Sequence, residues 1–490
     1  MTDRVVTDGG AKPPATEEAA PARSLAFSVA IRLLAVALLA WFVPVAGLVA
    51  LAALVVVWLF RSRLDVTTVL VLYAMALWFI PSRYTVGAFA VTGAMAFGFV
   101  AIVLWAYGRS LPTSRVAHGP SPTNRAVLVF LLVTLVNYAI VVLRPLSDLD
   151  QRSADRNLAI ILVLCGLAAA ITDGVRSARR LDRMLGVLVF GCAVVAMIGF
   201  VQYFFHIDVP RYLHPPGFHS TGEEAFTYHR TAFTRVAGTA LHPIEFGVAL
   251  AAMLPLALHY GSYARTSLSR NGARIAALLI VGAIPLTLSR SAVLATGLVA
   301  LVLLPTWAAG RRWRVFLTVI VALVVLNLLA PGVFRVIGQL FTGEKGAGSL
   351  ATRSDATTIG FNLIGRNPIF GNGFAVSSGS PVIIDNQYLV TGVETGLVGV
   401  VALFTVIGSG IVTARRARRG TADPAARDLA QSLVAMIGAL ALGGFGLNIL
   451  RFPITAGLLF IGVGSAGALL RIGRRTAIVE PPVELIGAEL

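Results

Sequence analysis

The sequence predicts an all-α polytopic membrane protein. Three observations support this fold class. Of the 490 residues, 57% are hydrophobic and only 13% are charged, whereas a soluble globular protein carries about 25% charged residues. Apolar stretches of about 20 residues, long enough to cross a bilayer, recur along the chain. No charged region between them is long enough to fold as a soluble domain.

The order of the apolar stretches predicts the domain organisation. Residues 1–24 are rich in Pro, Ala, Gly and charge, so we expect a disordered cytoplasmic tail. The first apolar stretch lacks a small-residue cleavage site and is interpreted as a retained helix. The remaining predicted segments are an N-terminal transmembrane bundle (25–206), a first external loop (207–242), central transmembrane helices (243–330), a second external loop (331–384), C-terminal transmembrane helices (385–472) and a cytoplasmic tail (473–490).

About 12–14 transmembrane helices of this length fit the apolar stretches. Their approximate centres are residues 34, 52, 73, 95, 134, 165, 194, 251, 280, 298, 322, 399, 437 and 461. Within the second external loop, the apolar residues Ile359, Leu363 and Ile364 recur at helical spacing. This spacing predicts a short amphipathic helix lying on the membrane, and a shift to Pro and Gly after it predicts a turn.

The charge distribution predicts the orientation. The formal net charge is +17, but most arginines lie in short alternate loops, where the positive-inside rule places them in the cytoplasm. This distribution argues against a nucleic-acid partner. It puts both termini in the cytoplasm and both long loops outside the cytoplasmic membrane. Cys165 and Cys192 lie in apolar stretches, which argues against a disulfide framework or a cysteine metal site.

Arginines on the external side break the positive-inside pattern and are therefore informative. Arg144, Arg152 and Arg156 lie beside three aspartates, and we expect solvated ion pairs there. Four others are candidate ligands of a substrate diphosphate, because a guanidinium donates two parallel hydrogen bonds and stays charged. They are Arg235, Arg290, Arg353 and Arg366. For Arg290, anchoring to lipid headgroups is the competing interpretation.

Three residues are candidate catalytic groups. Asp385 precedes the helix that follows the second loop, where it could act as a base or as a helix N-cap. Glu394 lies nine residues later, and pairing with an arginine is its alternative role. His242 precedes another helix and is a rival base near neutral pH. Zinc ligation by His214 and His219 is a weak alternative, so no metal and no cofactor is predicted.

Three patches of this sequence resemble the bacterial O-antigen ligase and O-antigen polymerase superfamily over roughly residues 230–410. The first is Arg235-x-x-Gly238 with His242-Pro243, and the second is the turn Ser289-Arg290-Ser291. The third and most specific patch begins at Arg353. It continues through Asn367-Pro368-x-x-Gly371-x-Gly373 to Asp385-Asn386-x-Tyr388-Leu389 and Glu394-x-Gly396.

The resemblance implies a multi-helix glycosyltransferase of the GT-C type. Such enzymes take a glycan from an undecaprenyl diphosphate carrier on the external face, by inverting, metal-independent chemistry, with external arginines binding the diphosphate. Ligases of the family carry His-Asn where this chain has Asp385-Asn386. This departure favours a polymerase, with Asn386 and Tyr388 as supporting residues. The expected partners are the lipid-linked glycan and the bilayer, and a chain-length regulator or a flippase stays open.

Two other functions fit a many-helix membrane protein with arginines. One alternative within the same family is a ligase that transfers the glycan to a lipid or wall acceptor. An alternative of another class is a transporter or flippase for a lipid-linked glycan, although the two halves show no internal repeat. A polyprenyl-phosphate mannosyltransferase is disfavoured, because the first external turn near Pro44 has no acidic residue.

Overall fold

The computed structural model describes residues 66–87, 91–110, 121–145, 147–215, 217–220, 229–230, 233–342, 344–375 and 384–479. The helices expected around residues 34 and 52, and the predicted tail 1–24, lie outside these ranges. Within them, a helix covers each predicted centre from residue 73 to residue 461. The protein is therefore an all-α polytopic membrane protein, as the sequence predicts.

The helices of the N-terminal half are α3 (Val66–Phe79), α4 (Gly93–Ser110), α5 (Pro122–Val142), α6 (Asp148–Gly174), α7 (Ala178–Phe205) and α8 (Val209–Tyr212). Those of the C-terminal half are α9 (Pro243–Tyr263), α10 (Ser267–Leu286), α11 (Arg290–Leu303), α12 (Ala309–Leu329), α13 (Val333–Thr342), α14 (Glu344–Arg366), α15 (Gln387–Arg419), α16 (Pro424–Gly443) and α17 (Pro453–Val479). A short 3-10 turn, η2 (Leu304–Thr306), joins α11 to α12.

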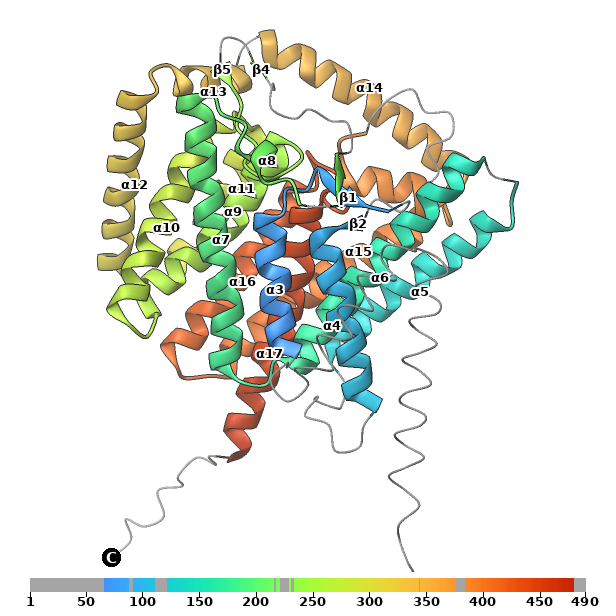
Figure 1. Cartoon of the computed structure of the whole chain (residues 1–490), viewed down its shortest axis with the longest axis horizontal. Coiled ribbons are helices and arrows are strands. Elements are labelled where there is room, and N and C mark those ends of the chain that lie inside the picture. The colour runs from blue at the N-terminus through green and yellow to red at the C-terminus, as the bar shows by residue number, and fades with distance from the viewer. Residues whose placement is uncertain are drawn as a thin grey trace, which may run out of the picture.

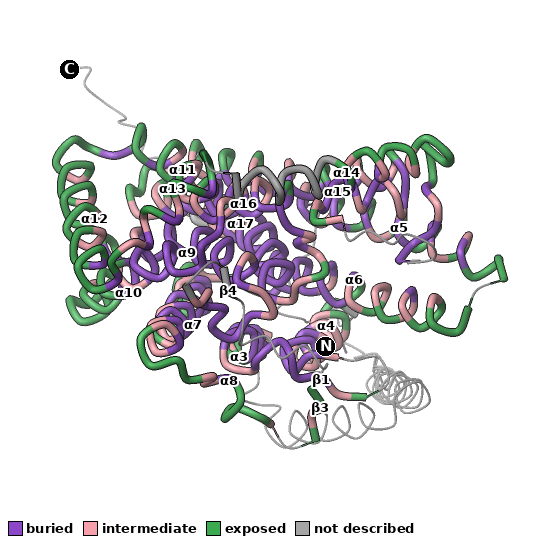
Figure 2. The backbone as a smooth tube through the Cα atoms, turned by 90° about the horizontal axis from the view of Figure 1, so that it is seen from above, coloured by how far each residue is buried: buried purple, intermediate pink, exposed green. Residues whose placement is uncertain are grey.

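Eight of the described helices are long and apolar enough to cross a membrane. They are α5, α6, α7, α9, α12, α15, α16 and α17, and shorter apolar helices such as α3, α4 and α11 pack among them. The core lies around α9 and α17, where 89% and 94% of the apolar window is buried. Figure 2 shows these two helices in the middle of the bundle and α12 at its edge.

The two long loops predicted on the external side cover one end of the bundle. The second loop forms α13 and α14, and Figure 1 shows α14 lying across the helix ends. The first loop contributes β3 (His219–Ser220), which pairs antiparallel with β1 (Tyr84–Val86) of the α3–α4 connection. Strand β1 also pairs with β2 (Val91–Thr92), and β4 (His229–Arg230) pairs with β5 (Phe233–Thr234).

We call this the loop end of the bundle, where α9, α11, α15 and α17 begin. The opposite end, where α7, α10, α12 and α16 begin, is held by a buried carboxylate. Asp173 is fully buried, accepts from Arg109 at 2.7 Å and forms an ion pair with Arg471 at 3.1 Å. Trp105 and Asn124 also donate to it. This network joins α4, α5, α6 and α17, and its ion pairs and hydrogen bonds to Asp173 offset the cost of burying that charge.

Candidate functional site at the loop end

Arg235 follows β5 and reaches the end of α10. Its Nε donates to the carbonyl oxygen of Thr287 over 3.0 Å. The chain just beyond it is held by Gln202, whose side-chain oxygen accepts from the N–H of Gly238 at 2.8 Å. Because Gln202 is buried in α7, the backbone that carries Arg235 is fixed against the bundle.

Arg290 stands at the tight turn between α10 and α11. Ser289 caps α11 by accepting from the N–H of Ala292, so Arg290 is the first helical residue. Its Nη1 lies 3.3 Å from the carbonyl oxygen of Leu340 in α13. Since Arg235 binds Thr287, three residues before Arg290, the structure brings two of the predicted patches together at the loop end.

His242 is the N-cap of α9. Its Nδ1 accepts from the N–H of Ile244 at 3.1 Å, and its ring lies 6.4 Å from that of Phe452. An accepting Nδ1 places the proton of the neutral ring on Nε2, since only one ring nitrogen can then carry it. In this arrangement the second nitrogen is a donor, so His242 is set up to cap a helix and to give a hydrogen bond.

Glu245 is a site residue that the sequence interpretation missed. It is fully buried in the first turn of α9 and accepts from the N–H of Leu241 at 2.8 Å and from that of Ile454 at 2.9 Å. It therefore caps its own helix and holds the start of α17. The spacing of His242 and Glu245 fits a capping box, in which a Glu three residues after the cap reaches back, and this signal was available in the sequence.

The start of α15 corrects the N-cap interpretation of Asp385. The cap is Asn386, whose side-chain oxygen accepts from the N–H groups of Tyr388 at 3.0 Å and Leu389 at 3.1 Å. Asp385 precedes the cap and is exposed. The capping role is therefore wrong for Asp385, because the neighbouring amide already fills it.

Tyr388 and Gln387 fix the start of α15 to α16 and to the α16–α17 connection. The Tyr388 hydroxyl donates to the carbonyl oxygen of Ala441 over 2.6 Å, and its ring stacks on Phe404. Gln387 is buried, and its side-chain oxygen accepts from the N–H of Leu450 at 2.7 Å. Tyr388 thus supports the segment that carries Asp385.

Glu394 lies just before a break in α15. At Gly396 the backbone turns to φ 69°, ψ −169°, which interrupts the helix. The turn after α14 fills this break: the N–H of Leu397 donates to Pro368 over 2.8 Å, and the N–H of Gly373 donates to the Glu394 carbonyl over 3.1 Å. The Gly371-Asn-Gly373 motif therefore closes a helix break.

Gly371 and Gly396 make this closure possible. A Cβ on Gly371 would lie 2.5 Å from the carbonyl carbon of Glu394, and one on Gly396 would lie 2.1 Å from the carbonyl oxygen of Ile369. Both glycines have positive φ, of 73° and 69°. The close approach of two backbones and the left-handed conformation both require glycine. This explains the two glycines of the third patch in physical terms.

Arg451 is a second residue that the sequence interpretation missed. It is exposed in the α16–α17 connection and interacts electrostatically with both Glu394 and Arg156. Arg156 is exposed as well, and two like charges close enough to repel each other favour a bound anion. The signal was available, because Arg451 breaks the positive-inside pattern in the same way as the four arginines that were selected.

The prediction of ion pairs for Arg144, Arg152 and Arg156 is wrong within the described part of the chain. None of the salt bridges there involves Arg144, Arg152 or Arg156. Arg144 points to the carbonyl oxygen of Asn372 over 3.4 Å. Asp155 instead accepts from the Tyr138 hydroxyl at 2.6 Å.

The remaining candidates lie in α14 and the first loop. Arg353 is in the middle of α14 and Arg366 is its last residue, where it is exposed. Thirteen residues of helix, a rise of roughly 20 Å, separate these two positions. His214 packs edge-on against Tyr84 with ring centroids 4.7 Å apart, and His219 lies in β3.

The loop end thus combines several elements of a site for an anionic substrate. Arg235 and Arg290 lie beside one turn, Arg156 and Arg451 form an exposed pair, and Asp385 is an exposed carboxylate on a fixed helix start. Such guanidinium groups can bind a diphosphate and stabilise the charge that develops as it leaves. A positioned carboxylate can accept a proton from an attacking hydroxyl.

One comparison with known protein families gives a match. Residues 275–404 match the O-antigen ligase family model. The matched range includes Arg290, Arg353, Arg366, Asp385 and Glu394, and it ends within α15. No curated protein sequence matches the chain.

Proposed function

We propose that the protein is a polysaccharide polymerase of the O-antigen ligase and polymerase superfamily, whose family model matches residues 275–404. It would lengthen an oligosaccharide linked to undecaprenyl diphosphate. The reaction would take place at the loop end, on the external face of the bacterial cytoplasmic membrane. The positive-inside distribution of arginines supports this orientation.

The proposed reaction is a displacement at the anomeric carbon of the donor sugar. The acceptor hydroxyl attacks this carbon, the bond to the lipid diphosphate breaks, and the configuration inverts. Asp385 would take the hydroxyl proton late in the attack. Arg235 and Arg290 would bind the diphosphate and stabilise its charge as it leaves, and Arg156 and Arg451 would add positive charge beside Glu394. We propose that no metal takes part.

One observation carries this proposal: the hydrogen bond from Arg235 to Thr287. This bond holds Arg235, which lies outside the matched range 275–404, against the turn that carries Arg290, which lies inside that range. Two guanidinium-bearing segments far apart in the sequence therefore meet at one place. A planar guanidinium is suited to phosphate oxygens, which lysine would contact only as a point charge.

The contacts of His242 favour Asp385 as the base. The Nδ1 of His242 accepts a hydrogen bond from the N–H of Ile244. If this nitrogen took a proton from the substrate, that bond would break and α9 would lose its N-cap. Asp385 is exposed and Asn386 does the capping, so its carboxylate is available for chemistry.

The test is a reaction of the purified protein in nanodiscs with undecaprenyl diphosphate-linked oligosaccharide. A ladder of longer lipid-linked glycans would support the polymerase. Transfer of the glycan to a separate lipid or wall acceptor without lengthening would favour the ligase instead. Donor recovered with its glycan unchanged and undiminished would contradict both.

The break in α15 is the observation that favours a transporter, because broken helices often line transport sites. In such sites the freed backbone groups point to the substrate or the coupling ion. Here Gly373 and Pro368 already bond to the backbone on both sides of the break. The break is therefore closed by the protein itself. Movement of the unaltered glycan across proteoliposome membranes would nevertheless overturn the glycosyltransferase proposal.

A further inference from the structure

A large cavity lies at the opposite end of the bundle, far from the candidate site. Its volume is about 1110 Å³, and its lining comes from α9, α10, α12, α16, the segment 306–308 and the last turn of α15. No proposed site residue lines it. The positive-inside rule assigns this end to the cytoplasm.

One wall of the cavity is apolar and continues into the membrane-facing surface. Val281 of α10 and Val315 of α12 line it, together with Leu278 and Leu317, which are 40% and 63% exposed. Helix α12 packs loosely, with only 6% of its apolar window buried, and it stands at the edge of the bundle in Figure 1. Exposed apolar side chains on such a helix contact acyl chains, so the cavity is accessible to lipid.

The lining of the cavity is also basic. Four arginines line it without a carboxylate partner among the described residues: Arg274, Arg314, Arg418 and Arg427. Arg274 donates to the Gly261 carbonyl at 2.9 Å, and Arg314 donates to the Gly310 carbonyl of its own helix at 3.2 Å. Both acceptors are neutral, so these bonds leave the positive charge in place.

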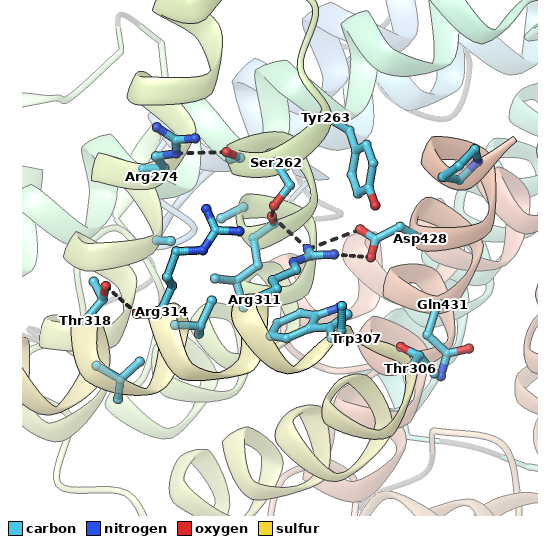
Figure 3. A pocket seen from close by; sticks show the side chains of 18 of the residues that line it. Ser262, Tyr263, Arg274, Thr306, Trp307, Arg311, Arg314, Thr318, Asp428 and Gln431 are labelled. Carbon is cyan, nitrogen blue, oxygen red and sulfur yellow. Dashed lines mark hydrogen bonds and ion pairs between the residues drawn. The ribbon is translucent and has the colours of Figure 1, made fainter.

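The one carboxylate in the lining is already engaged. Asp428 binds His259 at 2.9 Å and accepts from both terminal nitrogens of Arg311. Figure 3 shows Arg311 held between Asp428 and Trp307, with the Arg314 guanidinium between those of Arg274 and Arg311 in this view. The net charge that faces the cavity is therefore positive.

Trp307 adds a buried donor to the lining. Its ring lies under Arg311, 4.1 Å from the guanidinium carbon, and only 6% of the residue is exposed. Its Nε1 is buried and makes no hydrogen bond within the described part of the chain. A buried donor without an acceptor is costly, and a ligand oxygen in the cavity would supply one.

We propose that this cavity binds an anionic phospholipid of the cytoplasmic leaflet. The phosphate lies against Arg274, Arg314, Arg418 and Arg427, and the Trp307 N–H donates to a headgroup oxygen. An acyl chain lies along Leu278, Val281 and Val315. Basic pockets between helices on this side of a membrane bind headgroups of this kind, and the apolar wall distinguishes a lipid from a free phosphate.

The experiment measures binding of cardiolipin and phosphatidylglycerol to the full-length, detergent-purified protein by native mass spectrometry. The double variant Arg274→Gln/Arg314→Gln should bind both lipids about thirtyfold more weakly, because two arginine–headgroup contacts are lost. The matched control Arg179→Gln/Arg183→Gln removes two exposed arginines of α7 at the same end. It should bind as the unaltered protein does.

A second pair of variants tests the apolar wall without changing any charge. Val315→Trp fills the cavity and should weaken cardiolipin binding, whereas Val325→Trp, exposed elsewhere on α12, should not. Equal losses in cavity and control variants would overturn the proposal, as would phosphatidylcholine binding as tightly as cardiolipin. Displacement of cardiolipin by millimolar inorganic phosphate would assign the cavity to a free anion and would also overturn it.

Discussion

Two clusters of one carboxylate and two arginines lie at opposite ends of this protein, and their surroundings differ. At the opposite end, Asp173 is fully buried and its two oxygens form ion pairs with Arg109 and Arg471. At the loop end, Arg451 interacts with Glu394 and Arg156 only electrostatically, and both arginines are exposed.

The difference shows which arginines can serve a substrate. Arg109 and Arg471 already donate to a carboxylate in a low-dielectric interior, and replacing that partner by a ligand would cost several kcal/mol. Arg156 and Arg451 are exposed and repel each other, so an anion that approaches both lowers this repulsion. Composition alone cannot distinguish the clusters, because both contain the same residue types at the ends of helices.

The largest expected effect is on stability, at Asp173. Asp173→Ala leaves Arg471 and Arg109 without their shared carboxylate, which should lower the free energy of unfolding by about 3–5 kcal/mol. Thermal unfolding in nanodiscs, followed by intrinsic fluorescence, measures the change. If the variant is as stable as the unaltered protein, the cluster around Asp173 does not stabilise the fold. The contrast between a structural cluster at this end and a substrate-binding cluster at the loop end would then be wrong.

The next effect is on catalysis, at Asp385. Asp385→Asn removes the proposed base while Asn386 keeps the cap, so glycan transfer should fall by about a hundredfold or more. Stability should not change. The assay is the initial rate of glycan lengthening with lipid-linked donor, normalised to folded protein.

Asn386→Ala is the matched control for this variant. It removes the cap but leaves the carboxylate, so it should lower stability by about 1 kcal/mol and reduce the rate much less than Asp385→Asn. Full activity of Asp385→Asn would exclude Asp385 as the base and return the role to His242.

A smaller effect is expected at the turn that closes the break in α15. Gly371→Ala places a Cβ against the Glu394 carbonyl and strains a positive φ, which should cost about 1–3 kcal/mol. Gly365→Ala, at a helical glycine with open space around it, is the control and should be neutral or slightly stabilising. Equal stability of the two variants would mean that the loop 367–373 does not hold the break.

The positions of the helices follow from the sequence because membrane-spanning length and apolar composition are local properties. Helices cover the predicted centres from residue 73 to residue 461 for this reason. The meeting of Arg235 with the Arg290 turn also agrees with the prediction that both lie on one face. That prediction needed only the alternation of loops across the membrane.

The contacts that shape the site could not be predicted in the same way. Glu245 binds Ile454 across 209 residues and Gln387 binds Leu450 across 63, and such pairings depend on how helices pack. The break at Gly396 could not be predicted from hydropathy, because the mean hydropathy of a segment carries no information about backbone φ and ψ angles. The positive-inside rule could have identified Arg451 from the sequence. Glu394, with which Arg451 interacts, was predicted from its place in the third sequence patch.

The most direct test of the central claim compares Arg451→Ala with Arg471→Ala in one experiment that measures both transfer rate and stability. Arg451→Ala should slow glycan transfer by about tenfold to a hundredfold through a lost charged hydrogen bond and leave unfolding unchanged. Arg471→Ala should lower the free energy of unfolding by about 3 kcal/mol and leave the rate per folded molecule unchanged. Full transfer activity of Arg451→Ala, or loss of stability in both variants alike, would contradict the assignment of the loop end as the site.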